Sequence, residues 1–124
     1  MKPLAIITFF ALAGCSSLEP VRDHALHHVV LCWLKEQGNA QHRERIVEVT
    51  RSFDRIPGVL EARAGPVVPS ERSIVDDSFD VGILVVVPDE RRLREYLDHP
   101  IHQKAKNDVL VPLVEKILVY DFKL

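Results

Sequence analysis

The segment Tyr96-Leu97-Asp98-His99-Pro100-Ile101-His102 gathers the side chains of this sequence whose types and spacing could do chemistry. Pro100 can occupy the first turn of a helix, whereas the residue before it avoids helical dihedral angles, so His102 is expected early in a new short helix. The positive end of the helix dipole opposes protonation there, and a neutral imidazole near pH 7 is a usable base. His102 and the phenol of Tyr96 could therefore act as a catalytic base–phenol pair.

A structural role explains the same two residues, and the sequence alone favours it. Tyr96 lies on the apolar stripe of its predicted helix with Leu93 and Leu97, and His102 could hold the Pro100 turn. The same position in a fold can serve many functions or none, so the pattern does not establish catalysis.

Metal binding by His99 and His102 together with His28 is a third interpretation. Zinc needs three or four well-placed ligands, and Pro100 separates two of these histidines, which leaves their relative orientation open. We therefore predict no metal site and no cofactor.

Length and composition indicate one ordinary globular domain. The chain has 124 residues, of which 47% are hydrophobic and 27% charged, with a net charge of -2. Nucleic-acid binding needs a basic excess that is absent here, so no nucleic-acid partner is expected. The sequence contains no P-loop, G-x-G-x-x-G, Ser-His-Asp or C-x-x-C signature.

Hydrophobic periodicity places these residues on a small set of elements. The predicted strands and helices are, in chain order, a strand at Leu26–Leu34, a helix at Ala40–Ile56, a strand at Val59–Gly65, a strand at Phe79–Val87, a helix opened by Pro88-Asp89 and broken at His99-Pro100, a short helix to about Val109 limited by Pro112, and a strand at Ile117–Phe122. The long loop Pro66–Asp77 is expected to reach across a neighbouring surface. This order is the β-α-β-β-α-β pattern of an α+β ferredoxin-like protomer with a four-stranded antiparallel sheet.

The strands are apolar on both faces, and this predicts a second copy of the chain. In Phe79–Val87 only Asp80 is charged, and Leu26–Leu34 is also mainly apolar on each side. Two main helices cover one sheet face and leave none for the other, whereas an uncovered apolar face of that size is unusual in a soluble monomer. We expect a homodimer in which two sheets pack face to face as a dimeric α+β barrel.

Several motifs resemble the stress-responsive A/B barrel (Dabb) family. They are His28-Val29-Val30-Leu31-x-Trp33-x-Lys35, Ile56-Pro57-Gly58-Val59, Phe79-Asp80 and, most specifically, Tyr96-Leu97-x-His99-Pro100-x-His102. The resemblance covers Leu26 to Phe122 and implies a ferredoxin-like protomer, a dimeric barrel and a cavity between sheet and helices.

The resemblance also implies roles for particular residues. In a plant polyketide cyclase of the family the second His of H-P-x-H is the general base and the preceding Tyr assists, roles that would fall on His102 and Tyr96. That enzyme has a further active-site His on the third strand, where this chain has Val81. His28, His99 and Val81 are accordingly the other candidates for a ligand pocket.

The N-terminus resembles a bacterial lipoprotein signal. Met1-Lys2 precedes an apolar run from Pro3 to Ala13, which is too short to span a membrane, and Leu12-Ala13-Gly14-Cys15 resembles a lipobox. The resemblance implies cleavage before Cys15, acylation of its sulfur and anchoring in the membrane, and Ser16 favours sorting to the outer membrane, facing the periplasm. We predict a signal peptide at 1–14, a lipidated tether at 15–25 and the domain at 26–122.

Three functions remain open from the sequence. The first is a lipid-anchored dimer that binds a small apolar ligand or acts in envelope stress response. The second is a cofactor-free enzyme of the cyclase, lyase or monooxygenase type that uses His102 and Tyr96. The third is a purely structural assembly module, and enzyme activity is the less favoured interpretation.

Cys32, left without a partner once Cys15 is acylated, is expected to be a buried small hydrophobe.

Overall fold

The computed structural model describes residues 24–124; the predicted signal peptide, Cys15 and most of the tether lie outside the described residues. The elements in chain order are β1 (Leu26–Leu34), α1 (Ala40–Thr50), the 3₁₀ turn η1 (Arg51–Arg55), β2 (Glu61–Pro66), β3 (Val81–Val87), α2 (Glu90–Asp98), α3 (Pro100–Ala105), the π turn η2 (Lys106–Leu110), α4 (Val111–Leu113) and β4 (Val114–Lys123). The predicted β-α-β-β-α-β order is confirmed, with additional helical turns before the last strand.

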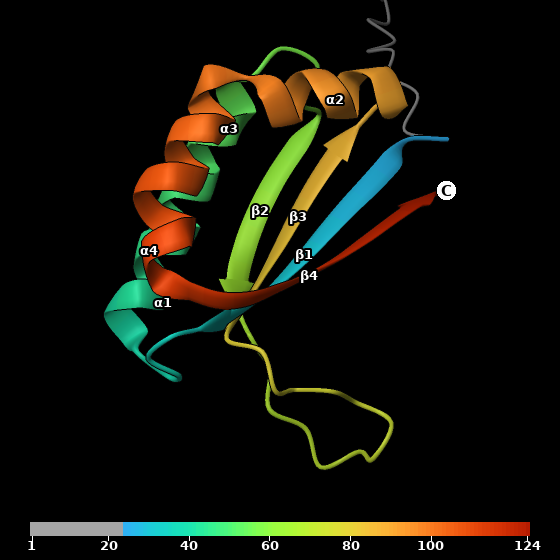
Figure 1. The fold of residues 1–124 in the computed structure, drawn as a ribbon. Helices are drawn as coiled ribbons and strands as arrows, with labels where there is room; N and C mark the ends of the chain where they lie inside the picture. Colours follow the sequence, from blue (N-terminus) through green and yellow to red (C-terminus); the bar gives the residue numbers. More distant parts are fainter. Residues whose placement is uncertain (1–23) are drawn as a thin grey trace, which may run out of the picture.

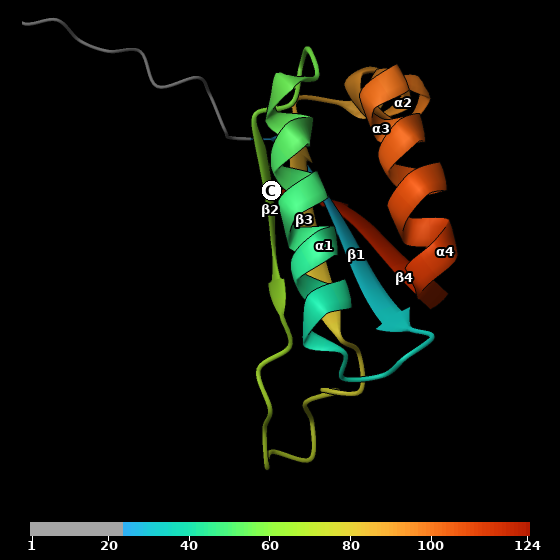
Figure 2. The same cartoon turned by 90° about the vertical axis from the view of Figure 1, so that its left-hand side faces the viewer.

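The four strands form one antiparallel sheet in the order β2-β3-β1-β4, which confirms the predicted ferredoxin-like fold. The helices lie together on one face of this sheet (Figure 1). Figure 2 shows that α1 runs beside the α3–α4 segment within that layer. Any site between helices and sheet is therefore built from these two groups of elements.

Alternate side chains of the strands fill the core between the sheet and the helix layer. Side chains of β1 alternate between buried positions on the helix face and partly exposed positions on the other. Val81, Ile83, Val85 and Val87 of β3 point the same way and are buried. Because successive strand residues face opposite sides, this register places His28 inside the core, among apolar neighbours.

Local capping signals set the helix boundaries. The side chains of Asn39 and Asp89 accept hydrogen bonds from the third residues after them, His42 N and Arg92 N, as expected of N-caps. Gly58, in the left-handed region at φ 87°, follows the first helical segment. Helical turns continue through Pro112 to Leu113, further than the predicted end at Val109, because a proline in the first turn of a segment removes no needed donor.

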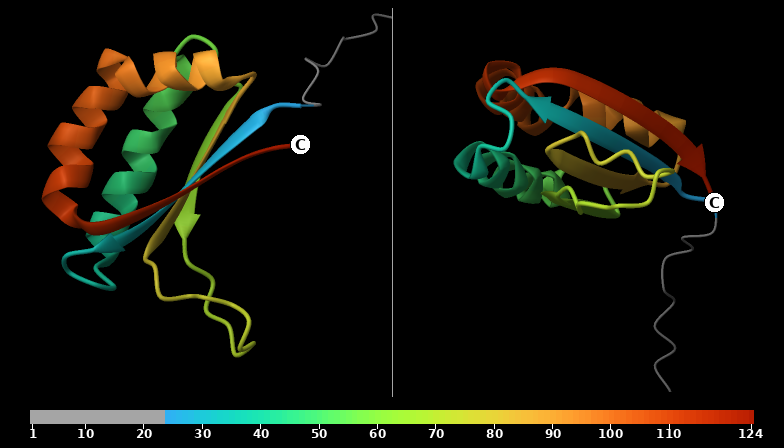
Figure 3. Two further views of the ribbon diagram at one scale, coloured as in Figure 1. Left: turned by 45° about the vertical axis from the view of Figure 1, so that its right-hand side comes forward. Right: turned by 90° about the horizontal axis from the view of Figure 1, so that it is seen from below.

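β3 begins at Val81 rather than at the predicted Phe79, and Asp80 directly precedes it. Its Oδ2 accepts a hydrogen bond from Leu34 N (2.9 Å) and its Oδ1 accepts one from Gly38 N (2.7 Å). The carboxylate thus ties the end of β1 and the following turn to the start of β3. The β2–β3 connection projects beyond the end of the sheet (Figures 1 and 3), and whether it reaches a neighbouring surface stays a prediction.

The sheet face opposite the helices, called here the bare sheet face, carries no covering element within residues 24–124 (Figure 3). The pairing register places these side chains on it: His27, Val29, Leu31, Trp33, Leu84, Val86, Leu118, Tyr120 and Phe122. The exposed fraction is 54% for Tyr120 and 48% for Phe122, and the Phe122 ring stacks on His27 at 5.2 Å between centroids.

The described residues include no helix long and apolar enough to cross a membrane.

Candidate functional site

A cavity of about 190 Å³ lies between the helix layer and the sheet, and we call it the helix–sheet cavity. Its lining residues are His28, Val30, Phe53, Ile83, Tyr96, Leu97, His102, Lys106, Leu110, Ile117 and Val119. The walls are mostly aliphatic and aromatic, with a few polar groups among them. This is the composition of a small-molecule pocket.

The break at His99-Pro100 brings Tyr96 and His102 together. His99 has extended dihedral angles, and its Nδ1 accepts a hydrogen bond from Ile101 N as the N-cap of α3. The chain thereby changes direction between α2 and α3, and the ring centroids of Tyr96 and His102 lie 4.6 Å apart. Phe53 of η1 packs against both rings. The predicted proximity of Tyr96 and His102 is observed, and His99 serves as a cap outside the cavity lining.

The ring of His102 is held in one tautomer. Its Nδ1 lies 2.9 Å from the carbonyl oxygen of Leu97, which can only accept, so Nδ1 carries the proton. Nε2 of the neutral ring then holds the lone pair. Burial lowers the pKa of His102 below its usual value, the Leu97 hydrogen bond opposes this shift, and the charges of Lys106 and His28 add to it. His102 therefore has the protonation state of a base near neutral pH.

A second oriented histidine faces the same cavity. His28 is buried, and its Nδ1 lies 2.6 Å from Oδ1 of Asp121, its cross-strand partner in β4. The carboxylate accepts the Nδ1 proton, which leaves Nε2 as the free ring nitrogen when the ring is neutral. Sequence analysis did not select Asp121, because only the β1–β4 register places it opposite His28.

Tyr96 supplies a neutral phenol. It is 2% exposed, and burial raises the pKa of its hydroxyl well above the usual range. The hydroxyl makes no hydrogen bond to another residue of 24–124. A phenol in this state can donate a hydrogen bond to a ligand oxygen but cannot act as a phenolate near pH 7.

The remaining candidates lie elsewhere. Val81 is fully buried and does not line the helix–sheet cavity. Burial raises the pKa of the Cys32 thiol to about 12, so this side chain is inert near neutral pH. Within the described part of the chain, no three His, Cys, Asp or Glu side chains are grouped so that they could hold a metal ion.

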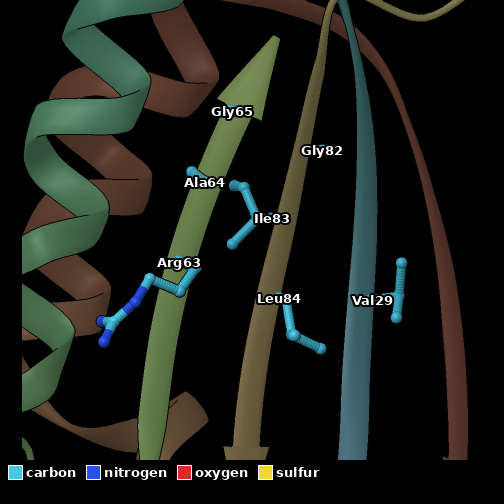
Figure 4. Close-up of a pocket in the computed structure, with 7 residues that line it drawn as sticks. All are labelled: Val29, Arg63, Ala64, Gly65, Gly82, Ile83 and Leu84. Atoms are coloured by element: carbon cyan, nitrogen blue, oxygen red, sulfur yellow. The ribbon is translucent and has the colours of Figure 1, made fainter. Parts of the chain in front are cut away.

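A second hollow, of about 260 Å³, lies on β1–β3 and is lined by Val29, Arg63, Ala64, Gly65, Gly82, Ile83 and Leu84. Figure 4 shows Val29 and Leu84 pointing one way and the Arg63 guanidinium pointing away from them. Nη1 of Arg63 donates to the carbonyl oxygen of Ala62 at 2.8 Å. No titratable group is aimed into this hollow, which is a depression of the bare sheet face rather than a site for chemistry.

We compared the sequence with models of known protein families to find the family to which it belongs. The model described as Stress responsive A/B Barrel Domain (Dabb) matches residues 26–124. The chain belongs to the Dabb family. None of the curated proteins matches this Dabb chain.

Solved structures similar to this Dabb domain share its fold. A Dabb family protein with a ferredoxin-like fold from Mesorhizobium loti is 25% identical, with a TM-score of 0.64, covering 81% of this chain and 96% of that one. A dimeric ferredoxin-like protein of unknown function from Jannaschia sp. CCS1 is 26% identical, with a TM-score of 0.63 and coverages of 81% and 99%. The hydroxynitrile lyase of Passiflora edulis is 17% identical, with a TM-score of 0.68 and coverages of 82% and 94%. The last of these shows the common fold alone.

Proposed function

We propose that this Dabb domain is a homodimer that binds a small, mostly apolar ligand in the helix–sheet cavity. The observation that carries the proposal is the free hydrogen-bonding capacity on apolar walls: the Tyr96 hydroxyl and the Nε2 atoms of His28 and His102 have no partner within residues 24–124. The three residues line the cavity, so a ligand bound there could pair with these polar atoms. The open cavity supports this function over a purely structural assembly.

Dimerisation is supported by the bare sheet face. Leu118, Tyr120 and Phe122 of β4 are exposed there beside half-buried side chains of β1, and exposed apolar patches on soluble proteins mark interaction sites. A second copy presents the same surface and covers it by a two-fold axis. The similar protein from Jannaschia sp. CCS1 is described as dimeric.

Proton transfer is a second candidate function, favoured by the tautomer of His102. Nε2 would take a proton from the ligand while the Tyr96 hydroxyl donates a hydrogen bond to the oxygen on which negative charge develops. His28, oriented by Asp121, is the second titratable ring at the same cavity. One solved structure with the same fold, at 17% identity, is described as a hydroxynitrile lyase.

The cellular setting of this function is also a proposal, since Cys15 lies outside the described residues. Acylation of Cys15 would hold the domain at the envelope membrane, facing the periplasm, where it would bind its ligand under stress. In a bacterial host we expect Cys15→Ser to abolish incorporation of labelled palmitate and to release the protein from the membrane fraction. Incorporation that persists in this variant contradicts the lipobox interpretation.

Native mass spectrometry of the protein released from membranes tests the binding function. We expect a dimer that retains a small molecule, and a His102→Ala protein that retains less of it. If the retained molecule is also consumed by the wild type and left intact by His102→Ala, proton transfer is supported. A dimer without retained mass that also binds no added apolar compound contradicts ligand binding.

A further inference from the structure

Lys106 occupies an unusual position at the edge of the helix–sheet cavity. It begins the π turn η2, which follows α3 without interruption. A π turn inserts one residue into the helical repeat and redirects the side chains that follow, and such turns are frequent at functional sites. Here the first residue of the turn lines the cavity together with Tyr96 and His102.

The ammonium group of Lys106 has no partner within residues 24–124, unlike those of the other lysines there. Lys35 donates to the carbonyl oxygen of Val111, Lys104 pairs with Asp108, Lys116 lies over the Trp33 ring, and Lys123 pairs with Glu90. No carboxylate or carbonyl of residues 24–124 holds the ammonium group of Lys106. The ammonium group at the cavity edge can therefore bind an anionic ligand without first breaking an ion pair.

No carboxylate of residues 24–124 lines the cavity, so an anion from solution would have to act as the counter-ion of Lys106 there. Asp121, across the sheet on the cavity side, is already engaged by His28. His102 and Lys106 are four residues apart on one helical segment, and both line the cavity. The charge of Lys106 also contributes to the lowered pKa of His102. Lys106 is the only lysine or arginine that lines the cavity among the described residues.

A second hollow continues from the cavity on the far side of Lys106. This outer hollow, of about 360 Å³, is lined by Lys106, Leu110, Val111, Val114, Glu115, Lys116 and Ile117. Lys106, Leu110 and Ile117 belong to both spaces, so they adjoin. A carboxylate bound to Lys106 would therefore lie where the two spaces meet, with the apolar body of the ligand in the helix–sheet cavity.

From these observations we infer that Lys106 selects the charge of the ligand, which is an apolar monocarboxylic acid whose carboxylate binds Lys106 and whose body lies in the helix–sheet cavity. This inference rests on the ligand-binding function proposed above. A single ammonium group suits one carboxylate, whereas a phosphate is usually met by several donors or an arginine fork, which the cavity lacks within residues 24–124.

The test compares 4-phenylbutyrate with its neutral amide, 4-phenylbutanamide, by calorimetric titration of the full-length protein in nanodiscs, with empty nanodiscs subtracted. We expect the wild type to bind the acid about tenfold more tightly than the amide, as befits one charge-assisted contact. Lys106→Met should remove this preference, so that acid and amide bind with about equal affinity, while Lys106→Arg should retain it. Lys104→Met is the matched control, because Lys104 lies on the same helical segment but pairs with Asp108 and is 80% exposed.

The outcomes separate this inference from the function on which it rests. Equal affinities for acid and amide in the wild type overturn the role of Lys106 but leave ligand binding in place. A preference for the acid that survives Lys106→Met also overturns it. Binding of neither compound to a folded wild-type protein overturns both.

Discussion

His28 on β1 and Asp121 on β4 are joined by a 2.6 Å contact between Nδ1 and Oδ1, although 93 positions separate them in the chain. The pair links the buried centre of the sheet to its exposed edge strand. It also determines which nitrogen of His28 remains free at the helix–sheet cavity. The predictions that follow begin with this pair.

Replacing Asp121 by alanine removes the acceptor from the buried Nδ1–H of His28. We expect Asp121→Ala to lower the free energy of unfolding by about 1–2 kcal/mol, the cost of one buried donor left unpaired. Asp121→Asn should cost less, because the amide oxygen still accepts. Urea unfolding at one fixed protein concentration measures both; equal stability of the alanine variant and the wild type contradicts a structural role for the pair.

Asp80 should contribute more to stability than any exposed acid of the β2–β3 connection. It is 3% exposed, and its carboxylate accepts from both Leu34 N and Gly38 N. We expect Asp80→Ala to cost about 2–3 kcal/mol in the free energy of unfolding, because two backbone donors lose their acceptor. Asp76→Ala, an exposed acid that accepts from Ser78 N, is the control and should change stability little. A small effect at both positions contradicts the tie between β1 and β3.

His102 should make the fold less stable in mild acid. Its pKa is lowered in the folded state from the ordinary value of 6.5, mainly by burial, so the unfolded chain binds the proton more readily. Well above pH 6.5 neither state binds this proton, and the pKa difference does not affect the free energy of unfolding. As the pH falls from 6.5 toward the lowered pKa, the unfolded chain binds the proton first, and the free energy of unfolding decreases. Denaturant unfolding between about pH 5 and 7.5 should show a shallower acid decline for His102→Gln than for the wild type. The exposed variant His24→Gln should retain the wild-type decline, and an identical decline in all three proteins argues against a buried His102 ring.

The bare sheet face should control association. Tyr120, on the edge strand β4, is 54% exposed on this face, and Val111, on the helix layer, is similarly exposed at 59%. We expect Tyr120→Glu to weaken the dimer roughly a hundredfold, since a charge would be buried without a partner in the interface. Val111→Glu should leave association unchanged. Light scattering of the detergent-solubilised protein over a range of concentrations measures this, and two variants that dissociate alike would place the interface elsewhere.

Local features of the chain were readable from the sequence because they depend on residues close together. The apolar run Leu26–Leu34 predicted β1 with its observed bounds, and Asn39 and Asp89 cap the helices that follow them. His99-Pro100 ends one helix and starts the next because proline restricts the dihedral angles of its neighbours. The excess of two-sided apolar strand, which leaves one face of the sheet bare, follows from the same alternation.

Contacts between polar groups far apart in the sequence were decided by the tertiary structure. Asp121 meets His28 through the β1–β4 register, and Asp80 meets Leu34 and Gly38 where three segments converge. Lys106 lines the same cavity as His102, at the start of a π turn that the sequence analysis did not predict. Strand periodicity assigns a side chain to a face of the sheet. Its neighbour across the sheet depends on register and packing, which only the folded chain specifies.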